Sequence, residues 1–160
     1  MVCDPVLRAG GGGRLGKDEV GYAMRERLLP LATIATPNLP EARILAELPE
    51  GSADECAEKL LPYCKHLLIT GGHGDEHEVH NRLYSRDGSR HTFTCYRLPG
   101  SYHGSGCTLA STLAGRLAIG EHLVSAVETA LNYTWRTLRD AEQLGQGQFV
   151  PRRLPLDFCS

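Results

Sequence analysis

Two hydrophobic periods alternate along this chain of 160 residues. Short apolar runs bounded by turn residues predict buried strands over residues 2–6, 31–35 and 66–70. Apolar residues three or four positions apart predict helices over 17–29, after 41, over 52–64, after 107 and over 123–141. Two more polar runs, 78–85 and 90–97, flank an Asp-Gly turn and predict a β-hairpin. Strands that alternate with helices in this way predict an α/β fold, with a parallel sheet flanked by helices and an antiparallel hairpin near the sheet's edge.

Local signals refine the ends of these elements. Ser52 precedes a helical segment and Glu55 follows three residues later, the spacing of a capping box. Pro30 is expected to end the helix over 17–29, because proline cannot donate a backbone hydrogen bond. Trp135 in the last helix is expected to belong to the core. No linker or internal repeat interrupts the pattern, so residues 1–160 are expected to form a single domain or part of one.

Composition excludes several classes of protein. The formal net charge is −2 and no basic stripe stands out, which argues against nucleic acid as a partner. No apolar run approaches the roughly 20 residues that span a bilayer, and the first residues do not resemble a secretion signal. We therefore expect a cytoplasmic globular protein without a membrane partner. Its cysteines form no CxxC pair and are expected to be reduced thiols; they stand at positions 3, 56, 64, 95, 107 and 159.

The loop before the fourth predicted helix carries the most informative chemistry. Its small residues, Gly104, Ser105 and Gly106, let a ligand approach the backbone. The free N–H groups of Ser105, Gly106 and Cys107 would point outward at the positive end of a helix dipole. This arrangement suits an anion, phosphate above all, and Cys107 beside it is a candidate thiolate. The alternative is a glycine-rich turn in which Ser105 merely caps the helix.

Other polar loops follow the predicted strands, where open α/β sheets bind ligands. Asp4 and Glu41 could share a magnesium ion through water, although acidic residues at strand ends are more often caps or solvated. A metal site formed by the histidines at 73, 77 and 80 is disfavoured by the glycines around them. The glycine tract 10–13 is either a flexible loop or a lid over a ligand.

Four of these segments, in this order and at this spacing, resemble the hydroxymethylpyrimidine/phosphomethylpyrimidine kinases of thiamine biosynthesis, in the ribokinase-like superfamily. The segments are Val2-Cys3-Asp4-Pro5-Val6, Thr36-Pro37-Asn38-Leu39-Pro40-Glu41-Ala42, Gly71-Gly72-His73 and His103-Gly104-Ser105-Gly106-Cys107-Thr108. The resemblance covers nearly the whole chain. Pyridoxal kinases share much of the pattern but usually carry Asp where Cys107 stands, so Cys107 favours the pyrimidine branch.

The resemblance implies a ribokinase-like fold and ATP-dependent phosphorylation of 4-amino-5-hydroxymethyl-2-methylpyrimidine and then of its monophosphate. Cys107 takes the catalytic position, and the residues before it, 104–106, form the anion hole for the transferring phosphoryl group. Asn38, Thr70 and Gly72 correspond to ATP-binding positions. The resemblance places Asp4 and Glu41 near Mg²⁺. Phosphoryl transfer depends mostly on positioning and charge neutralisation, which backbone amides and a metal supply.

The chain departs from the family pattern in two ways. Thr70 stands where the family usually has a lysine that meets the ATP phosphates, and a hydroxyl cannot neutralise phosphate. The N-terminal part of the fold, which carries much of the pyrimidine pocket, is expected to be missing. A homodimer or a separate N-terminal chain could therefore restore the site. Alternative interpretations are a non-catalytic nucleotide-binding remnant, a pyridoxal kinase-like protein and a redox-sensing protein built around Cys107.

Overall fold

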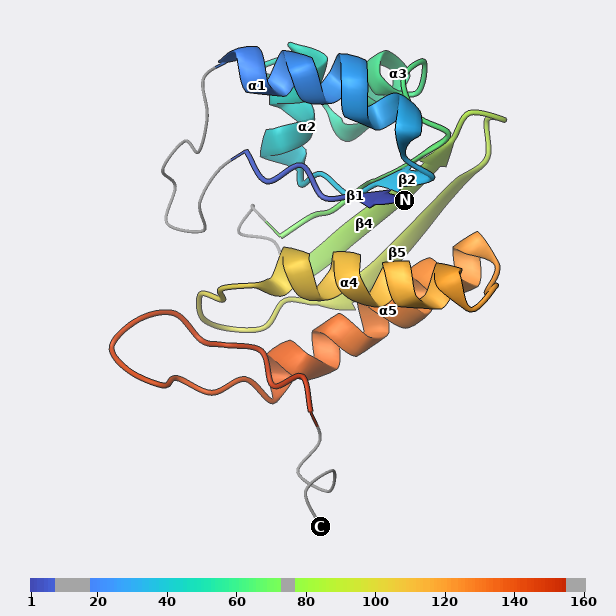
Figure 1. Cartoon of the computed structure of the whole chain (residues 1–160). Coiled ribbons are helices and arrows are strands. Elements are labelled where there is room, and N and C mark those ends of the chain that lie inside the picture. Colours follow the sequence, from blue (N-terminus) through green and yellow to red (C-terminus); the bar gives the residue numbers. More distant parts are fainter. Residues whose placement is uncertain (8–17, 73–76, 155–160) are drawn as a thin grey trace. The chain divides into compact units, whose positions relative to one another are not determined.

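The computed structural model describes residues 1–7, 18–72 and 77–154 (Figure 1). The chain divides into two compact units, Met1–Arg97 and Leu98–Ser160. The glycine tract 10–13, His73 and Cys159 lie outside the described residues. None of the helices in the described ranges is long and apolar enough to cross a lipid bilayer.

The first unit is built on a five-stranded sheet whose spatial order follows the sequence. Its strands are β1 (Val2–Cys3), β2 (Ile34–Ala35), β3 (His66–Ile69), β4 (Glu78–Ser85) and β5 (Arg90–Tyr96). The first three are parallel, with Cys3 opposite Ala35 and Ala35 opposite Leu67. The last two add antiparallel strands at one edge. The predicted α/β sheet with a hairpin at its edge is therefore confirmed.

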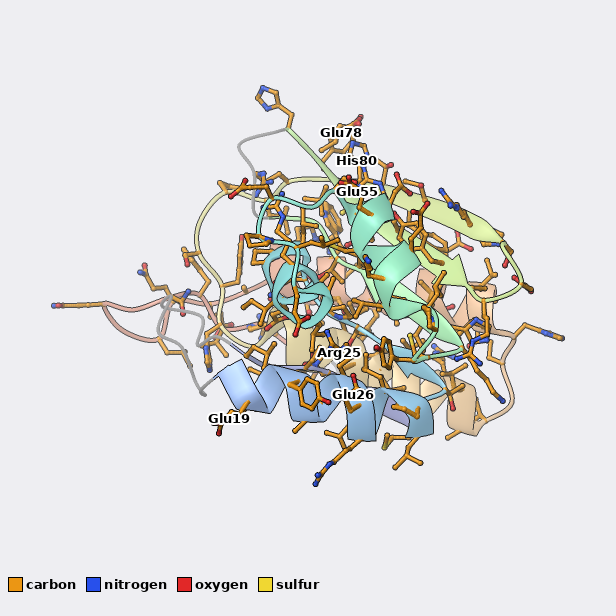
Figure 2. The ribbon with its side chains drawn as sticks, turned by 90° about the horizontal axis from the view of Figure 1, so that it is seen from above. Glu19, Arg25, Glu26, Glu55, Glu78 and His80 are labelled. Carbon is orange, nitrogen blue, oxygen red and sulfur yellow. The ribbon has the colours of Figure 1, made fainter. Side chains whose placement is uncertain are left out.

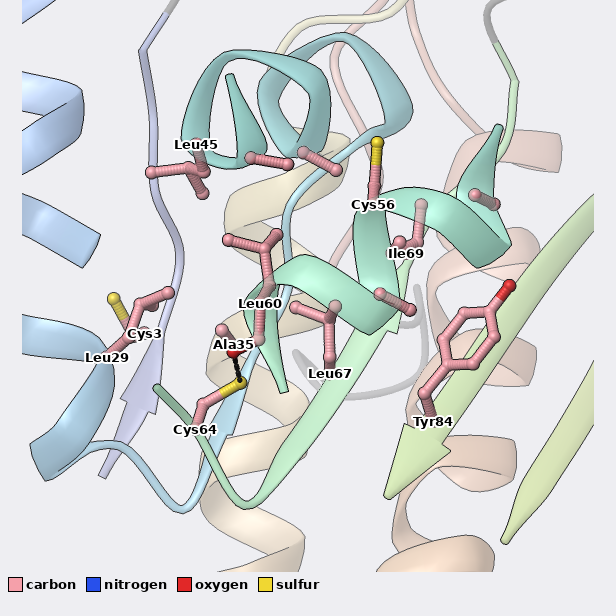
Figure 3. Close-up of a cluster of buried hydrophobic side chains, with 14 of the residues drawn as sticks. Cys3, Leu29, Ala35, Leu45, Cys56, Leu60, Cys64, Leu67, Ile69 and Tyr84 are labelled. Carbon is pink, nitrogen blue, oxygen red and sulfur yellow. Dashed lines mark hydrogen bonds between the residues drawn. The ribbon is translucent and has the colours of Figure 1, made fainter. Parts of the chain in front are cut away.

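Helices α1 (Asp18–Ala23), α2 (Leu39–Ala46) and α3 (Ala53–Leu60) lie on the same side of this sheet (Figure 1). Both α2 and α3 begin with a capping box, and the box predicted at Ser52 and Glu55 is confirmed. Their apolar sides pack onto the strands to form one buried cluster (Figure 3). Fully or almost fully buried members of the cluster include Leu45, Cys56, Leu60, Leu67 and Ile69.

The chain between α1 and β2 differs from the prediction. After α1 it continues as a π-helix, η1 (Met24–Leu28), and a 3₁₀ turn, η2 (Leu29–Leu31). Pro30 does not end the helical segment, because it occupies the first turn of η2, where its missing N–H is not needed. The predicted strand over 31–35 is shorter: Leu31 is 70% exposed, and only Ile34 and Ala35 pair.

Arg25 ties this helical segment to α2. Its guanidinium donates to the carbonyl of Leu45 at 3.1 Å and pairs with Glu26 at 3.1 Å and Glu47 at 3.4 Å (Figure 2). The same group lies over the ring of Tyr63, 5.3 Å from its centroid. A largely buried arginine is therefore satisfied by several partners, as its low exposure requires.

The second unit contains a pair of packed helices, α4 (Ser105–Ala118) and α5 (Leu123–Arg139). Leu113 of α4 and Val127 and Ala130 of α5 are fully buried. The prediction that Trp135 belongs to the core is wrong: it is half-buried, and the guanidinium of Arg139 lies 5.7 Å from its ring centroid. The five described cysteines are free thiols, of which Cys107 is exposed.

Candidate functional site

In the first unit, the loops that follow β2 and β3 are joined by backbone hydrogen bonds. Asn38 and Thr70 form an isolated parallel bridge. The N–H of Leu39 donates to the carbonyl of Thr70 at 3.2 Å, and the N–H of Thr70 donates to the carbonyl of Pro37 at 2.9 Å. Two predicted ATP-binding residues, Asn38 and Thr70, are thus neighbours at the carboxyl edge of the sheet.

Glu41 lies at the start of α2 and is only 5% exposed. One carboxylate oxygen accepts from the N–H of Asn38 at 3.0 Å, and the other accepts from the N–H of Leu7 at 3.3 Å. The side chain of Asn38 in turn accepts from the N–H of Glu41 at 2.8 Å. This carboxylate therefore closes the capping box of α2 and also holds the segment that follows β1.

Asp4 follows β1 directly and is half-buried. Among the described residues, its carboxylate receives one long hydrogen bond, from the hydroxyl of Thr36 at 3.4 Å. Burial raises the pKa of Asp4, and the hydrogen bond from Thr36 opposes this only in part. A half-buried carboxylate with so few donors has lone pairs left for a cation, and oxygen ligands with several waters are what Mg²⁺ prefers.

The two carboxylates thus fit a magnesium ion unequally. Among the residues that the structure describes, Asp4 accepts a single long hydrogen bond, whereas both oxygens of Glu41 receive backbone N–H groups. Glu41 fits as a ligand through water more readily than as a direct one.

Among the described residues, no group of three or more His, Cys, Asp or Glu side chains could hold a metal ion. His80 instead lies 3.0 Å from the hydroxyl of Thr94 and 3.9 Å from Glu78 (Figure 2).

Glycine is required where β3 ends. A Cβ on Gly71 would lie 2.6 Å from the carbonyl oxygen of His80, so no larger residue fits there. The N–H of Gly71 donates to the side chain of Asn81 at 3.2 Å. Gly72 has a left-handed φ of +103°, and its carbonyl accepts from the guanidinium of Arg97 at 2.9 Å. The predicted ATP-binding residue Gly72 is therefore held in place from β4 and from the end of β5.

In the second unit, α4 begins without a side-chain cap. Gly104 is the N-cap residue, with a left-handed φ of +87°, and Ser105 is the first residue of the helix. The alternative in which Ser105 caps the helix is therefore wrong. The N–H groups of a helix's first turn have no acceptor within the helix, so those of Ser105, Gly106 and Cys107 are available to an anion.

Thr108 and Arg153 complete this loop, and sequence reasoning missed both. The hydroxyl of Thr108 donates to the carbonyl of Gly104 at 2.8 Å and accepts from Nε of Arg153 at 3.0 Å. A Cβ on Gly104 would lie 2.9 Å from Nη2 of Arg153. The only signal in the sequence is the pair of arginines 152–153, which gives no indication that one of them returns to a loop 45 residues earlier.

The predicted site residues therefore fall into two groups. Those of the first unit follow β1, β2 and β3 and are Asp4, Asn38, Glu41, Thr70 and Gly72. Those of the second unit are consecutive and open α4: Gly104, Ser105, Gly106 and Cys107. Each group offers what phosphate and its counter-ions need, namely carboxylates and a hydroxyl in one, free backbone amides in the other.

A family model described as phosphomethylpyrimidine kinase matches residues 1–152. The chain belongs to the phosphomethylpyrimidine kinase family. It is 35% identical to a hydroxymethylpyrimidine/phosphomethylpyrimidine kinase of Haemophilus influenzae, over 92% of this chain and 58% of that protein. It is 38% identical to the thiamine biosynthesis bifunctional protein ThiED of Geobacter sulfurreducens, over 92% of this chain and 31% of that protein. The predicted resemblance is confirmed.

Solved structures agree with this family and show the ribokinase-like fold that was predicted. Pyridoxal kinase of Bacillus subtilis, in an ADP complex, superposes with a TM-score of 0.85 at 28% identity, over 95% of this chain and 59% of that chain. Pyridoxal kinase of Staphylococcus aureus, in complex with AMP-PCP, gives 0.82 at 27% identity, over 95% and 57%. This member of the phosphomethylpyrimidine kinase family thus spans a little over half the length of these two structures.

Proposed function

We propose that this chain carries the nucleotide-binding and phosphoryl-transfer part of a kinase that phosphorylates the hydroxymethyl group of 4-amino-5-hydroxymethyl-2-methylpyrimidine and then its monophosphate. The observation that carries the proposal is the uncapped start of α4 at Gly104, within a chain that the family model matches over residues 1–152. A helix that starts this way offers free N–H groups to a phosphoryl group without a competing side chain. In this proposal ATP is the phosphoryl donor.

Each group of residues has a separate task. The amides of Ser105 and Gly106 bind the transferring phosphoryl group and stabilise the charge that develops on it. Cys107, exposed at the same turn, orients the substrate hydroxyl or accepts its proton as the oxygen attacks phosphorus and the bond to ADP breaks. Asn38, Thr70 and Gly72 meet the nucleotide. Asp4 and Glu41 would hold Mg²⁺, which would supply positive charge to neutralise the phosphates.

Calorimetric titration of Mg-ATP into the purified chain tests the proposal, on a sample that unfolds cooperatively. Saturable binding that disappears when magnesium is omitted supports it, and phosphorylation of the hydroxymethylpyrimidine is then assayed. A folded chain that binds no Mg-ATP contradicts it. Pyridoxal as a competing acceptor distinguishes the second candidate, a pyridoxal kinase-like activity, which the similarity to the two solved pyridoxal kinases favours.

Replacing Cys107 tests the catalytic assignment. We expect Cys107→Ala to lower turnover by about 10²- to 10⁴-fold, the usual range for loss of a proton-transfer group, with Mg-ATP affinity little changed. Cys95→Ala in β5 is the matched control and should leave turnover unchanged. Near-normal turnover in Cys107→Ala would remove this thiol from the mechanism.

A non-catalytic remnant that binds nucleotide is the other candidate, and Thr70 favours it. A threonine hydroxyl can donate a hydrogen bond to phosphate but cannot neutralise its charge. Binding of Mg-ATP without transfer to either acceptor, alone or with a separately supplied N-terminal part of a relative, would support this candidate.

A further inference from the structure

The guanidinium of Arg153 lies against the start of α4. Its Nε donates to the hydroxyl of Thr108 at 3.0 Å, and its Nη2 would lie 2.9 Å from a Cβ placed on Gly104. Thr108 is buried, so it fixes the near side of the guanidinium. Arg153 is exposed, and within the described part of the chain its other guanidinium N–H groups, beside the free amides of the first turn, have no hydrogen-bond partner.

Hydrogen bonds to α5 fix the backbone at Arg152 and Arg153. The carbonyl of Arg153 accepts from the hydroxyl of Tyr133 in α5, and the N–H of Arg152 donates to the carbonyl of Thr137 at 2.9 Å. A few residues earlier, Phe149 exchanges backbone hydrogen bonds with the loop before α4, on both sides of Tyr102. The position of the guanidinium therefore follows from contacts with α5 and with the loop itself.

The charge balance at this position is unusual. A cation beside a helix N-terminus is repelled by the positive end of the dipole. Among the described residues, Arg153 forms no ion pair that would offset this repulsion, whereas its neighbour Arg152 pairs with Glu142 at 3.1 Å. An arginine that lies beside free helix amides is complementary to an anion with several oxygens.

We propose that Arg153 contacts the phosphoryl group that binds at the start of α4 and supplies positive charge there. This inference rests on the proposed function, because it assigns a further residue to the same phosphate site. The other phosphate ligands proposed for this chain, backbone amides and the hydroxyl of Thr70, are uncharged. The guanidinium fork fits two phosphate oxygens at once, which an amide cannot do.

Variants at two adjacent arginines test the inference. Arg153→Ala is compared with Arg152→Ala, which removes the same charge from the adjacent residue, whose guanidinium pairs with Glu142 instead. Both are titrated by calorimetry with Mg-ATP, with inorganic tripolyphosphate and with adenosine. We expect Arg153→Ala to weaken ATP and tripolyphosphate binding by roughly 10- to 100-fold, the usual loss for a charged hydrogen bond, and to leave adenosine binding unchanged. Arg152→Ala should change each affinity by less than about threefold.

Two further variants separate charge from structure. Arg153→Lys keeps the charge and should recover part of the affinity, whereas Arg153→Gln keeps a donor for Thr108 without the charge and should not. If Arg153→Ala fails to unfold cooperatively, the comparison of Arg153→Lys with Arg153→Gln tests the inference. Equal polyphosphate binding by Arg153→Gln, Arg153→Lys and the wild type would overturn the inference.

The wild-type titrations distinguish failure of the inference from failure of the proposed function. Binding of Mg-ATP that is unaffected by Arg153→Ala overturns the inference and leaves the function standing. Arginine-dependent binding of tripolyphosphate without binding of Mg-ATP supports the inference and contradicts the function. A folded chain that binds neither probe overturns both.

Discussion

Gly104 and Gly120, at the two ends of α4, share almost the same left-handed backbone, with φ of +87° and +85°. They differ in their surroundings. A Cβ on Gly104 would lie 2.9 Å from Nη2 of Arg153, whereas a Cβ on Gly120 would meet nothing within 4 Å. The two glycines therefore separate the cost of backbone strain from the cost of crowding at the candidate phosphate site.

We expect Gly104→Ala and Gly120→Ala each to lower the free energy of unfolding by about 1 to 2 kcal/mol, because an L-residue is strained in this conformation. Only Gly104→Ala should also weaken Mg-ATP binding, since its methyl group displaces the guanidinium of Arg153. Chemical denaturation and calorimetry on the same samples measure the two effects. An equal loss of affinity in both variants would show that the strain of α4, and not the site, determines binding.

Asp4 and Asp87 predict opposite responses to pH. Burial raises the pKa of Asp4, so its folded form holds a proton more tightly than the unfolded chain does. Its contribution to stability is therefore fully present below the unfolded pKa of about 3.9 and is lost as pH rises through the folded pKa. Hydrogen bonds from Ser89 lower the pKa of Asp87, so its contribution is present above about 3.9 and is lost as pH falls through the folded pKa.

We accordingly expect Asp4→Asn to stabilise the chain at pH 7 relative to the wild type, with the gain disappearing in acid. Asp87→Asn should instead destabilise it at pH 7. Unfolding midpoints in denaturant, measured from about pH 3 to pH 7, show for each variant whether its stability lies above or below that of the wild type. Asp4→Asn should also weaken the magnesium dependence of ATP binding, because substitutions that stabilise a functional site commonly reduce its function. If Asp4→Asn is less stable at neutral pH, desolvation is not what governs this carboxylate.

At the scale of elements, α2 and α3 begin with the same kind of capping box, but the glutamate of the box is buried in α2 and exposed in α3. Glu41 is buried and holds the N–H of Leu7 as well as that of Asn38, whereas Glu55 is at the surface and serves only its own box, at Ser52. Losing an acceptor costs far more where the donors are buried, because water cannot replace it.

We expect Glu41→Ala to lower the free energy of unfolding by about 1 to 3 kcal/mol for each buried N–H that it leaves unpaired, and Glu55→Ala to have a much smaller effect. Denaturant titration of the two variants measures the difference. Glu41→Ala should also weaken Mg-ATP binding, whereas Glu55→Ala should not. Similar losses of stability would mean that the contact with Leu7 contributes little and that Glu41 acts only as a helix cap.

Elements that rest on local signals could be predicted from the sequence, and those that rest on distant contacts could not. A few consecutive residues determine each of three features that were predicted: the capping box at Ser52, the Asp-Gly hairpin and the loop at the start of α4. The 3₁₀ turn at Pro30 was missed because proline both ends α-helices and begins tighter turns. Arg153 was missed because its position depends on backbone pairing between Phe149 and the loop before α4.

At the scale of the whole molecule, the residues proposed to bind ATP are divided between the two compact units. The proposed nucleotide and magnesium residues belong to Met1–Arg97, and the proposed anion loop belongs to Leu98–Ser160. The chain spans 58% of the length of its Haemophilus relative. A bound nucleotide is the one ligand that the proposal requires both units to recognise.

Amide hydrogen exchange with and without Mg-ATP tests this requirement directly. We expect slower exchange in two separate segments. The amides of Thr70 to Gly72 would lie beside the bound nucleotide in the proposal, and those of Ser105 to Cys107 would donate to its phosphates. Amides in the turn between β4 and β5, such as Ser89, serve as the internal control and should not change. Tripolyphosphate should protect the second segment. Protection confined to the second segment even with Mg-ATP would mean that the chain binds phosphate without engaging the nucleotide, and would contradict the assignment of Asn38, Thr70 and Gly72.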